Sequence, residues 1–177
     1  MKIPSRFMPK YAHAKPSTGS IASIFLVILA FSFIYVFWKY PQATSLVLVT
    51  LLVVVQIEIH RTRKAHRALA LSRAGESICD FARAFDCKVI DTWIVRAVYE
   101  QLQEHLGLEY RIPIRSTDTF GKDLQIDSED LDMEIVQEIA QRTGRTLENP
   151  EKNPYYDKIN TVGDLVYFFN AQPRANR

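Results

Sequence analysis

Two apolar stretches lie back to back near the N-terminus, and the pattern changes completely after them. Residues 21–38 read IASIFLVILAFSFIYVFW and residues 43–59 read ATSLVLVTLLVVVQIEI. The first stretch has no charge and no polar face, and each stretch approaches the ~20 residues that a membrane span needs. The turn at 39–42 is too short for anything but an antiparallel pair. We therefore predict a two-span transmembrane hairpin; the alternative is a helical hairpin buried in a soluble core.

Beyond residue 90 the apolar residues recur at the spacing of amphipathic helices, without a competing strand pattern. Asp91 is suited to cap the first helix, and Gly107 and Gly144 are stop signals after the first two. Thr161 and Asp164 stand at capping-box spacing before the third. The predicted helices cover residues 92–106, 128–143 and 162–170, and a long loop covers 108–126. The expected fold class is all-α: a two-span transmembrane helical hairpin plus a small helical bundle.

The same pattern divides the chain into segments. Residues 61–73 are expected to continue the second span as a helix with a basic face among anionic lipid headgroups, and Gly75 breaks it. Residues 77–85 form a short amphipathic helix that packs on the bundle or on the membrane surface. The predicted parts are a basic disordered tail (1–20), the hairpin (21–59), a basic juxtamembrane and amphipathic helical linker (60–90), the bundle (91–172) and a tail (173–177).

Charge is distributed unevenly along the chain. Residues 1–75 contain ten Lys and Arg and one acid, a net charge of +9, whereas residues 76–177 contain twelve and nineteen, a net charge of −7. Basic residues flank both outer ends of the hairpin, and the turn carries only Lys39. Because Lys and Arg stay on the cytoplasmic side, we expect a multi-pass protein of the cytoplasmic (inner) membrane with both termini in the cytoplasm.

Two segments of the soluble part resemble the acyl carrier protein family. Asp123-Leu-Gln-Ile-Asp127-Ser128 is similar to the family's D-L-x-x-D-S at the start of its second helix. Lys158-Ile-Asn-Thr161-Val-Gly-Asp164 is similar to the K-I-x-T-V-x-D run that leads into its last helix. The resemblance covers residues 91–172 and implies an acyl-carrier-like helical bundle. The chain also resembles an uncharacterised bacterial family with the carrier fold, in which the modifiable serine is often absent.

In the acyl carrier family the serine carries 4′-phosphopantetheine, so the resemblance implies this cofactor on Ser128. The N–H groups at the start of a helix also favour a phosphate. The family usually has Leu directly after the serine, whereas Glu129 and Asp130 stand here, and the downstream apolar positions fit only if one residue is inserted before Glu134. The alternative is that Ser128 only caps the helix, with the acids of the first turn complementing the helix dipole.

Acidic residues crowd the second predicted helix, with eight acids and one base, Lys122, between residues 118 and 138. We interpret them as a surface that docks a basic-surfaced protein partner by electrostatic steering; the alternative is a solvated face without a partner. A calcium loop is excluded because Leu131 occupies a ligand position and the central glycine is missing. The candidate partner-binding residues are Asp127, Glu129, Asp130, Asp132, Glu134 and Glu138.

Other chemistry finds little support in the sequence. Cys79 and Cys87 lack a CxxC spacing or a histidine pattern and are expected to be free thiols. No histidine lies close to Ser128 in the sequence, and there is no glycine-rich phosphate loop. We expect no enzyme activity, no metal site and no nucleic-acid partner.

Three functional hypotheses follow from these patterns. The first is a membrane-anchored, non-catalytic interaction module. The second is a true membrane-tethered acyl carrier, with 4′-phosphopantetheine on Ser128, that serves lipid or envelope synthesis. The third places the function in the hairpin itself, as a subunit of a membrane protein.

Overall fold

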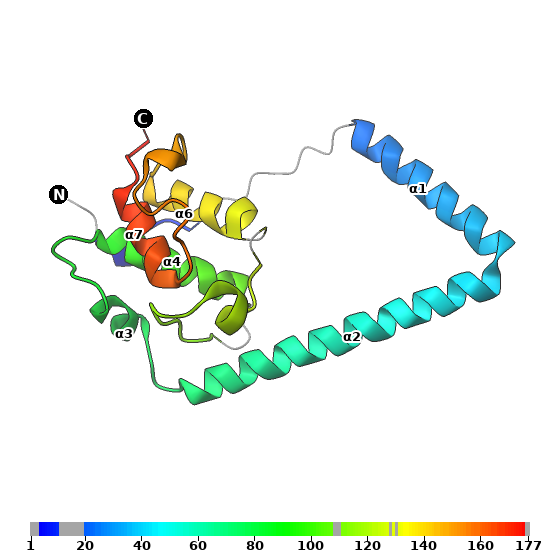
Figure 1. The fold of residues 1–177 in the computed structure, drawn as a ribbon, viewed down its shortest axis with the longest axis horizontal. Helices are drawn as coiled ribbons and strands as arrows, with labels where there is room; N and C mark the ends of the chain where they lie inside the picture. Colours follow the sequence, from blue (N-terminus) through cyan, green and yellow to red (C-terminus); the bar gives the residue numbers. More distant parts are fainter. Residues whose placement is uncertain (1–3, 11–19, 108–110, 128, 130, 176–177) are drawn as a thin grey trace. The chain divides into compact units, whose positions relative to one another are not determined.

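The structure, a computed structural model, describes residues 4–10, 20–107, 111–127, 129 and 131–175. It is mostly helical, and these residues contain no strand beyond two isolated bridges, which confirms the all-α prediction (Figure 1). The chain forms two compact units, Ala12–Lys64 and Met1–Tyr11 with Ala65–Arg177. The α-helices are α1 (Ser20–Lys39), α2 (Pro41–Ser72), α3 (Ile78–Arg83), α4 (Thr92–His105), α6 (Val136–Thr143) and α7 (Val162–Ala171). The described residues also include the short 3-10 helices η1 (Ser5–Phe7) and η4 (Pro150–Lys152) and the π-helical turns η2 (Phe120–Leu124) and η3 (Leu131–Ile135).

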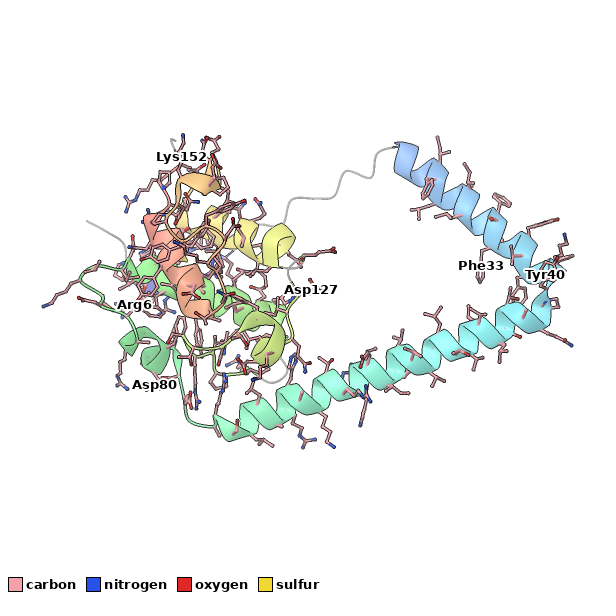
Figure 2. The ribbon with its side chains drawn as sticks, in the orientation of Figure 1. Arg6, Phe33, Tyr40, Asp80, Asp127 and Lys152 are labelled. Carbon is pink, nitrogen blue, oxygen red and sulfur yellow. The ribbon has the colours of Figure 1, made fainter. Side chains whose placement is uncertain are left out.

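The first of these units, Ala12–Lys64, contains α1 and the apolar part of α2. α2 is long and apolar enough to cross a membrane, and Ile24–Lys39 forms a shorter apolar helix. The predicted turn narrows to Tyr40, because Pro41 already occupies the first position of α2, where a missing N–H costs nothing. Large apolar side chains such as Phe33 are exposed along both helices (Figure 2). A helix that is apolar on all sides needs an apolar surrounding, so membrane association is supported, and the second span remains a prediction.

α2 continues without a break past the apolar stretch to Ser72, as the sequence predicted for the basic segment. This segment is rich in Arg, Lys, Ala and Leu, which lose little side-chain freedom in a helix. The helix ends before Gly75, whose φ of +96° is a left-handed conformation that suits glycine. The juxtamembrane residues and the apolar stretch therefore belong to one helix.

The second unit is a helical bundle in which α4 packs against both α6 and α7. Asp91 caps α4 by accepting a hydrogen bond from the N–H of Trp93, as predicted. Thr161 and Asp164 form the predicted capping box at the start of α7. The predicted inward residues of the three helices are buried: Ile94, Val95, Val98, Tyr99, Leu102, Leu131, Ile135, Ile139, Val162, Leu165, Val166 and Phe169.

The second predicted helix does not form a uniform α-helix. Leu131–Ile135 is a π-helical turn, η3, and only then does α6 run as an α-helix to Thr143, where Gly144 stops it in a left-handed conformation. A π-turn holds one more residue between its hydrogen-bonded partners than an α-turn. The turn keeps Leu131, Ile135 and Ile139 all in the core.

The N-terminal tail differs from its prediction. We expected a disordered tail over residues 1–20, but residues 4–10, here called the N-terminal segment, lie on the bundle. η1 contacts α4, Met8 is buried, and Arg142 on α6 donates a hydrogen bond to the carbonyl of Pro9. The apolar Met8 and the buried guanidinium of Arg142 give this segment partners that a reading of its basic composition did not anticipate.

The amphipathic helix predicted over 77–85 forms as α3, and it packs on the bundle. Ser77 caps α3 in a capping box with Asp80, which lowers the pKa of that carboxyl through the hydrogen bonds donated by Ser77. Phe81 and Phe85 are buried and their rings make an edge-on contact. Of the two surroundings considered for this helix, the bundle is therefore the one that the contacts support.

Candidate functional site

The acidic segment that begins at Asp127 has an exposed part and a buried part. Asp127, Glu129 and Glu134 are exposed, and Glu134 lies 3.8 Å from Nδ1 of His105. Ser128 and Asp130 lie outside the described residues, and so does the side chain of Asp132. Three of the six candidate docking carboxylates are thus exposed among the residues that the structure describes.

Glu138 lies in the interior, contrary to its expected place on an exposed acidic face. It is 6% exposed and accepts a hydrogen bond from Gln101 on α4. Arg142, one turn further along α6, donates to Gln101 and forms an ion pair with Glu100. Acidic residues three to four positions apart share a helix face, but the π-turn and the tight contact with α4 place Glu138 on the packed side. It joins α4 to α6 and is not a docking residue.

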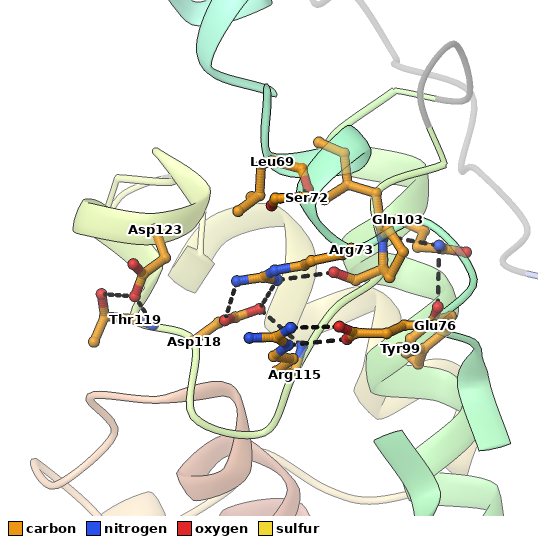
Figure 3. Close-up of polar contacts among 12 residues, drawn as sticks. Leu69, Ser72, Arg73, Glu76, Tyr99, Gln103, Arg115, Asp118, Thr119 and Asp123 are labelled. Atoms are coloured by element: carbon orange, nitrogen blue, oxygen red, sulfur yellow. Dashed lines mark hydrogen bonds and ion pairs between the residues drawn. The ribbon is translucent and has the colours of Figure 1, made fainter. Parts of the chain in front are cut away.

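A buried ion pair fixes the loop that leads into the acidic segment (Figure 3). Arg73 forms two hydrogen bonds with the carboxylate of Asp118, of 2.6 and 2.7 Å, and a third with the carbonyl of Pro113, of 2.8 Å. Asp118 also accepts the N–H of Arg115. Arg73 is 7% exposed and Asp118 3%. This bidentate geometry is the strong form of an arginine–carboxylate contact, and it joins the end of α2 to the loop.

Local sequence patterns predict surface positions for both members of this pair. Arg73 ends the predicted basic helix over residues 61–73, and Asp118 is the first of the eight acids between residues 118 and 138. The two residues are 45 positions apart, so no spacing rule connects them. One local feature sets Arg73 apart from the other basic residues of this segment. It stands just before the helix-breaking Gly75, where α2 has ended, so it does not share the basic face of that helix.

A second ion pair lies at the rim of the same loop. Arg115 donates from Nε to Glu76 at 2.9 Å and from Nη2 to the other oxygen of that carboxylate. The hydrogen bond lowers the pKa of Glu76 and raises the pKa of Arg115. Because Arg115 is exposed and Glu76 only partly buried, this pair orders the loop at a smaller desolvation cost than the buried pair.

The acid that opens the first carrier-like segment closes a turn. Asp123 accepts hydrogen bonds from the backbone N–H and the hydroxyl of Thr119, at 2.8 and 2.7 Å, and these bonds lower its pKa (Figure 3). Leu124 and Ile126, on either side of Gln125, are buried in the core. Nε2 of His66, on α2, lies 3.2 Å from the carbonyl of Leu124. The backbone that leads to Asp127 is therefore held by the core on one side and by α2 on the other.

The two carrier-like segments meet through this loop. Thr119 forms an isolated bridge with Thr161, and the N–H of Val162 donates to the carbonyl of Asp118 at 2.9 Å. The N–H of Gly163 donates to the carbonyl of Ser116 at 2.8 Å. A Cβ at Gly163 would lie 2.9 Å from that carbonyl oxygen, so the close approach requires glycine. Asp123 and Asp164 thus stabilise the two ends of one junction.

The described residues contain no group of three or more His, Cys, Asp and Glu side chains that could hold a metal ion. Cys79 and Cys87 are free and exposed. Comparison of the chain with protein families, with curated proteins and with solved structures finds no match. The candidate site therefore consists of the exposed carboxylates and the loop that holds them.

We expect the buried ion pair to dominate the stability of this region. Asp118→Asn or Arg73→Met leaves one partner buried without its counter-charge, which destabilises by about 3–5 kcal/mol. Urea unfolding of the full chain in dodecyl maltoside, followed by circular dichroism, measures this loss. The matched control is Arg83→Met, which breaks an exposed pair with Asp80 and is expected to have little effect.

The double variant Arg73→Met, Asp118→Leu separates the pair from its members. Because an apolar pair avoids the desolvation of two charges, we expect it to recover much of the loss. Single variants no less stable than Arg83→Met would contradict the anchoring role of the pair.

Proposed function

We propose that this chain is a membrane-anchored, acyl-carrier-like protein that acts as a non-catalytic interaction module. α1 and the apolar part of α2 form a two-span hairpin in the cytoplasmic membrane, and both termini face the cytoplasm. The bundle docks a basic-surfaced protein partner through an acidic surface that includes Asp127, Glu129 and Glu134.

One observation carries the topology. The N-terminal segment precedes the apolar helices and residues 65–175 follow them, yet both belong to one compact unit. Met8 is buried there, and Arg142 donates to the carbonyl of Pro9. Segments before and after a membrane crossing can pack together only if the chain between them returns to the same side. A single crossing by α2 would separate them, so this packing supports a second crossing by α1.

Length and charge agree with two crossings. α1 has 20 residues, which at about 1.5 Å per residue corresponds to about 30 Å, the thickness of the hydrocarbon core. The basic residues that follow the apolar stretch of α2 are exposed and suited to anionic headgroups. They are Arg61, Arg63, Lys64 and Arg67.

The docking role is supported by the difference between the buried and the exposed carboxylates. Asp118 and Glu138 are buried in contacts that hold the fold together. Asp127, Glu129 and Glu134 are exposed and lie within eight residues of one another. Such a concentration of like charge favours a partner of opposite charge and speeds its association through long-range attraction.

Cysteine labelling tests the topology. In a chain with Cys79→Ser and Cys87→Ser, we expect Gln42→Cys to react with a membrane-impermeant maleimide in intact bacterial cells, because Gln42 is exposed in the first turn of α2, at the outer end of the proposed hairpin. The native Cys79 and Cys87, which are exposed on the bundle, should react only after the membrane is permeabilised. Labelling of the native cysteines in intact cells would overturn the orientation.

Site-specific photocrosslinking tests the docking surface. A photoreactive amino acid at the exposed, uncharged Gln137 should crosslink the full chain to a protein with a basic surface in the host cell. The product should be lost when Asp127→Asn, Glu129→Gln and Glu134→Gln are combined, and weakened by salt. The matched control neutralises two other exposed acids, Glu148→Gln and Glu151→Gln. A crosslink that depends equally on both sets of acids would contradict the docking role.

A second candidate is a true membrane-tethered carrier with 4′-phosphopantetheine on Ser128, serving lipid or envelope synthesis. Two observations favour it. The neighbours Asp127 and Glu129 are both exposed, and the π-turn at Leu131–Ile135 absorbs the residue by which this chain departs from the carrier pattern. A membrane anchor would raise the effective concentration of such a carrier near a membrane enzyme.

Intact mass separates the two candidates. After coexpression with a broad-specificity phosphopantetheinyl transferase, a carrier gains the mass of one 4′-phosphopantetheine group, and Ser128→Ala abolishes the gain. For the interaction module we expect an unchanged mass. A gain that persists in Ser128→Ala would assign the modification to another residue and contradict the second candidate.

A further inference from the structure

A cleft of about 530 Å³ opens on the bundle. None of its lining residues belongs to the acidic segment that begins at Asp127. Its walls are formed by the N-terminal segment, the chain before α4 and the start of that helix, the chain after α6, and the end of α7 with the chain beyond it. Its lining includes Ser5, Lys88, Trp93, Arg145, Asn170 and Arg174. All of these residues belong to one compact unit.

The charge in this cleft is predominantly positive. Three cations, Lys88, Arg145 and Arg174, line it together with one carboxylate, Asp91. Asp91 is already occupied, since it caps α4 through the N–H of Trp93 at 3.0 Å and lies 3.6 Å from Nη2 of Arg174. The start of α4 is therefore satisfied by its own cap, and the excess positive charge comes from the side chains.

Arg145 is the most informative of these cations. It is half-buried, and its guanidinium donates to the backbone carbonyls of Asn170 and Gln172. The salt bridges found in the described part of the chain leave Arg145 without a carboxylate partner. Burial and the neighbouring Arg174 lower the pKa of Arg145, and the attraction of Asp91 offsets only part of this effect. A partly desolvated guanidinium beside a second one is unfavourable unless an anion joins them, and its five N–H donors exceed the carbonyls that it contacts.

We propose that this cleft binds a phosphate group, held by the guanidinium groups of Arg145 and Arg174 with Lys88 at the rim. Three cations against one carboxylate leave two positive charges, which match a phosphate dianion better than a single carboxylate. Arginine forks match the oxygens of phosphate in bidentate fashion. The phosphate comes either free from solution or from the headgroup of a lipid.

Equilibrium dialysis of the full chain in dodecyl maltoside against radiolabelled inorganic phosphate tests the site. We expect saturable binding with one phosphate per chain. Arg174→Gln, at an exposed position, should weaken it by about tenfold or more, because one charged hydrogen-bond partner is lost. The matched control, Lys152→Gln, removes an exposed positive charge that does not line the cleft and should leave binding unchanged.

Arg145→Gln and Arg145→Lys distinguish a loss of phosphate binding from a loss of folding. Arg145→Lys keeps the charge and should retain part of the binding, whereas Arg145→Gln should lose it with the same helix content by circular dichroism. Absence of saturable binding by the native chain overturns the proposal, and so does binding that survives in both Arg145→Gln and Arg174→Gln. Competition by dihexanoyl phosphatidic acid identifies the source: stronger competition than by inorganic phosphate indicates a lipid headgroup, and weaker competition a free phosphate.

Discussion

The buried ion pair between Arg73 and Asp118 is the contact on which the second unit depends. It joins the residue that follows α2 to the loop that leads to the acidic segment, and Pro113 and Arg115 complete its hydrogen bonds. A charge in the interior is tolerated only with such complete compensation. The loop has little regular structure of its own, so this pair, the rim pair of Glu76 with Arg115 and the Thr119–Asp123 turn together determine its path.

The same loop gives a structural reason for several residues of the two carrier-like segments. Asp123 closes the turn at Thr119, and Asp164 completes the capping box with Thr161. Leu124 and Ile126 fill the core between them. Each of these positions therefore has a structural reason to hold its residue, independent of any cargo. What a partner or a modifying enzyme could recognise is concentrated in the exposed residues that follow, Asp127 and Glu129 among them.

The N-terminal segment connects the two proposals. Its packing on α4 and α6 brings both sides of the apolar stretch into one compact unit, which supports the two-span topology. The same segment provides Ser5 as one wall of the cationic cleft. Residues that composition alone would place in a flexible tail thus pack on the bundle and line a candidate binding site.

The sequence by itself determined the elements whose signals are local. Apolar runs predicted the helices before residue 60, and 3.6-residue periodicity, caps and glycine stops predicted α4, α6 and α7 with their buried faces. Only the tertiary structure decided which charges are inside. Arg73, Asp118 and Glu138 look like surface residues to any local rule, because their partners lie 37 to 45 positions away. The N-terminal segment and the cleft around Arg145 depend likewise on contacts between distant parts of the chain, which neither spacing nor composition encodes.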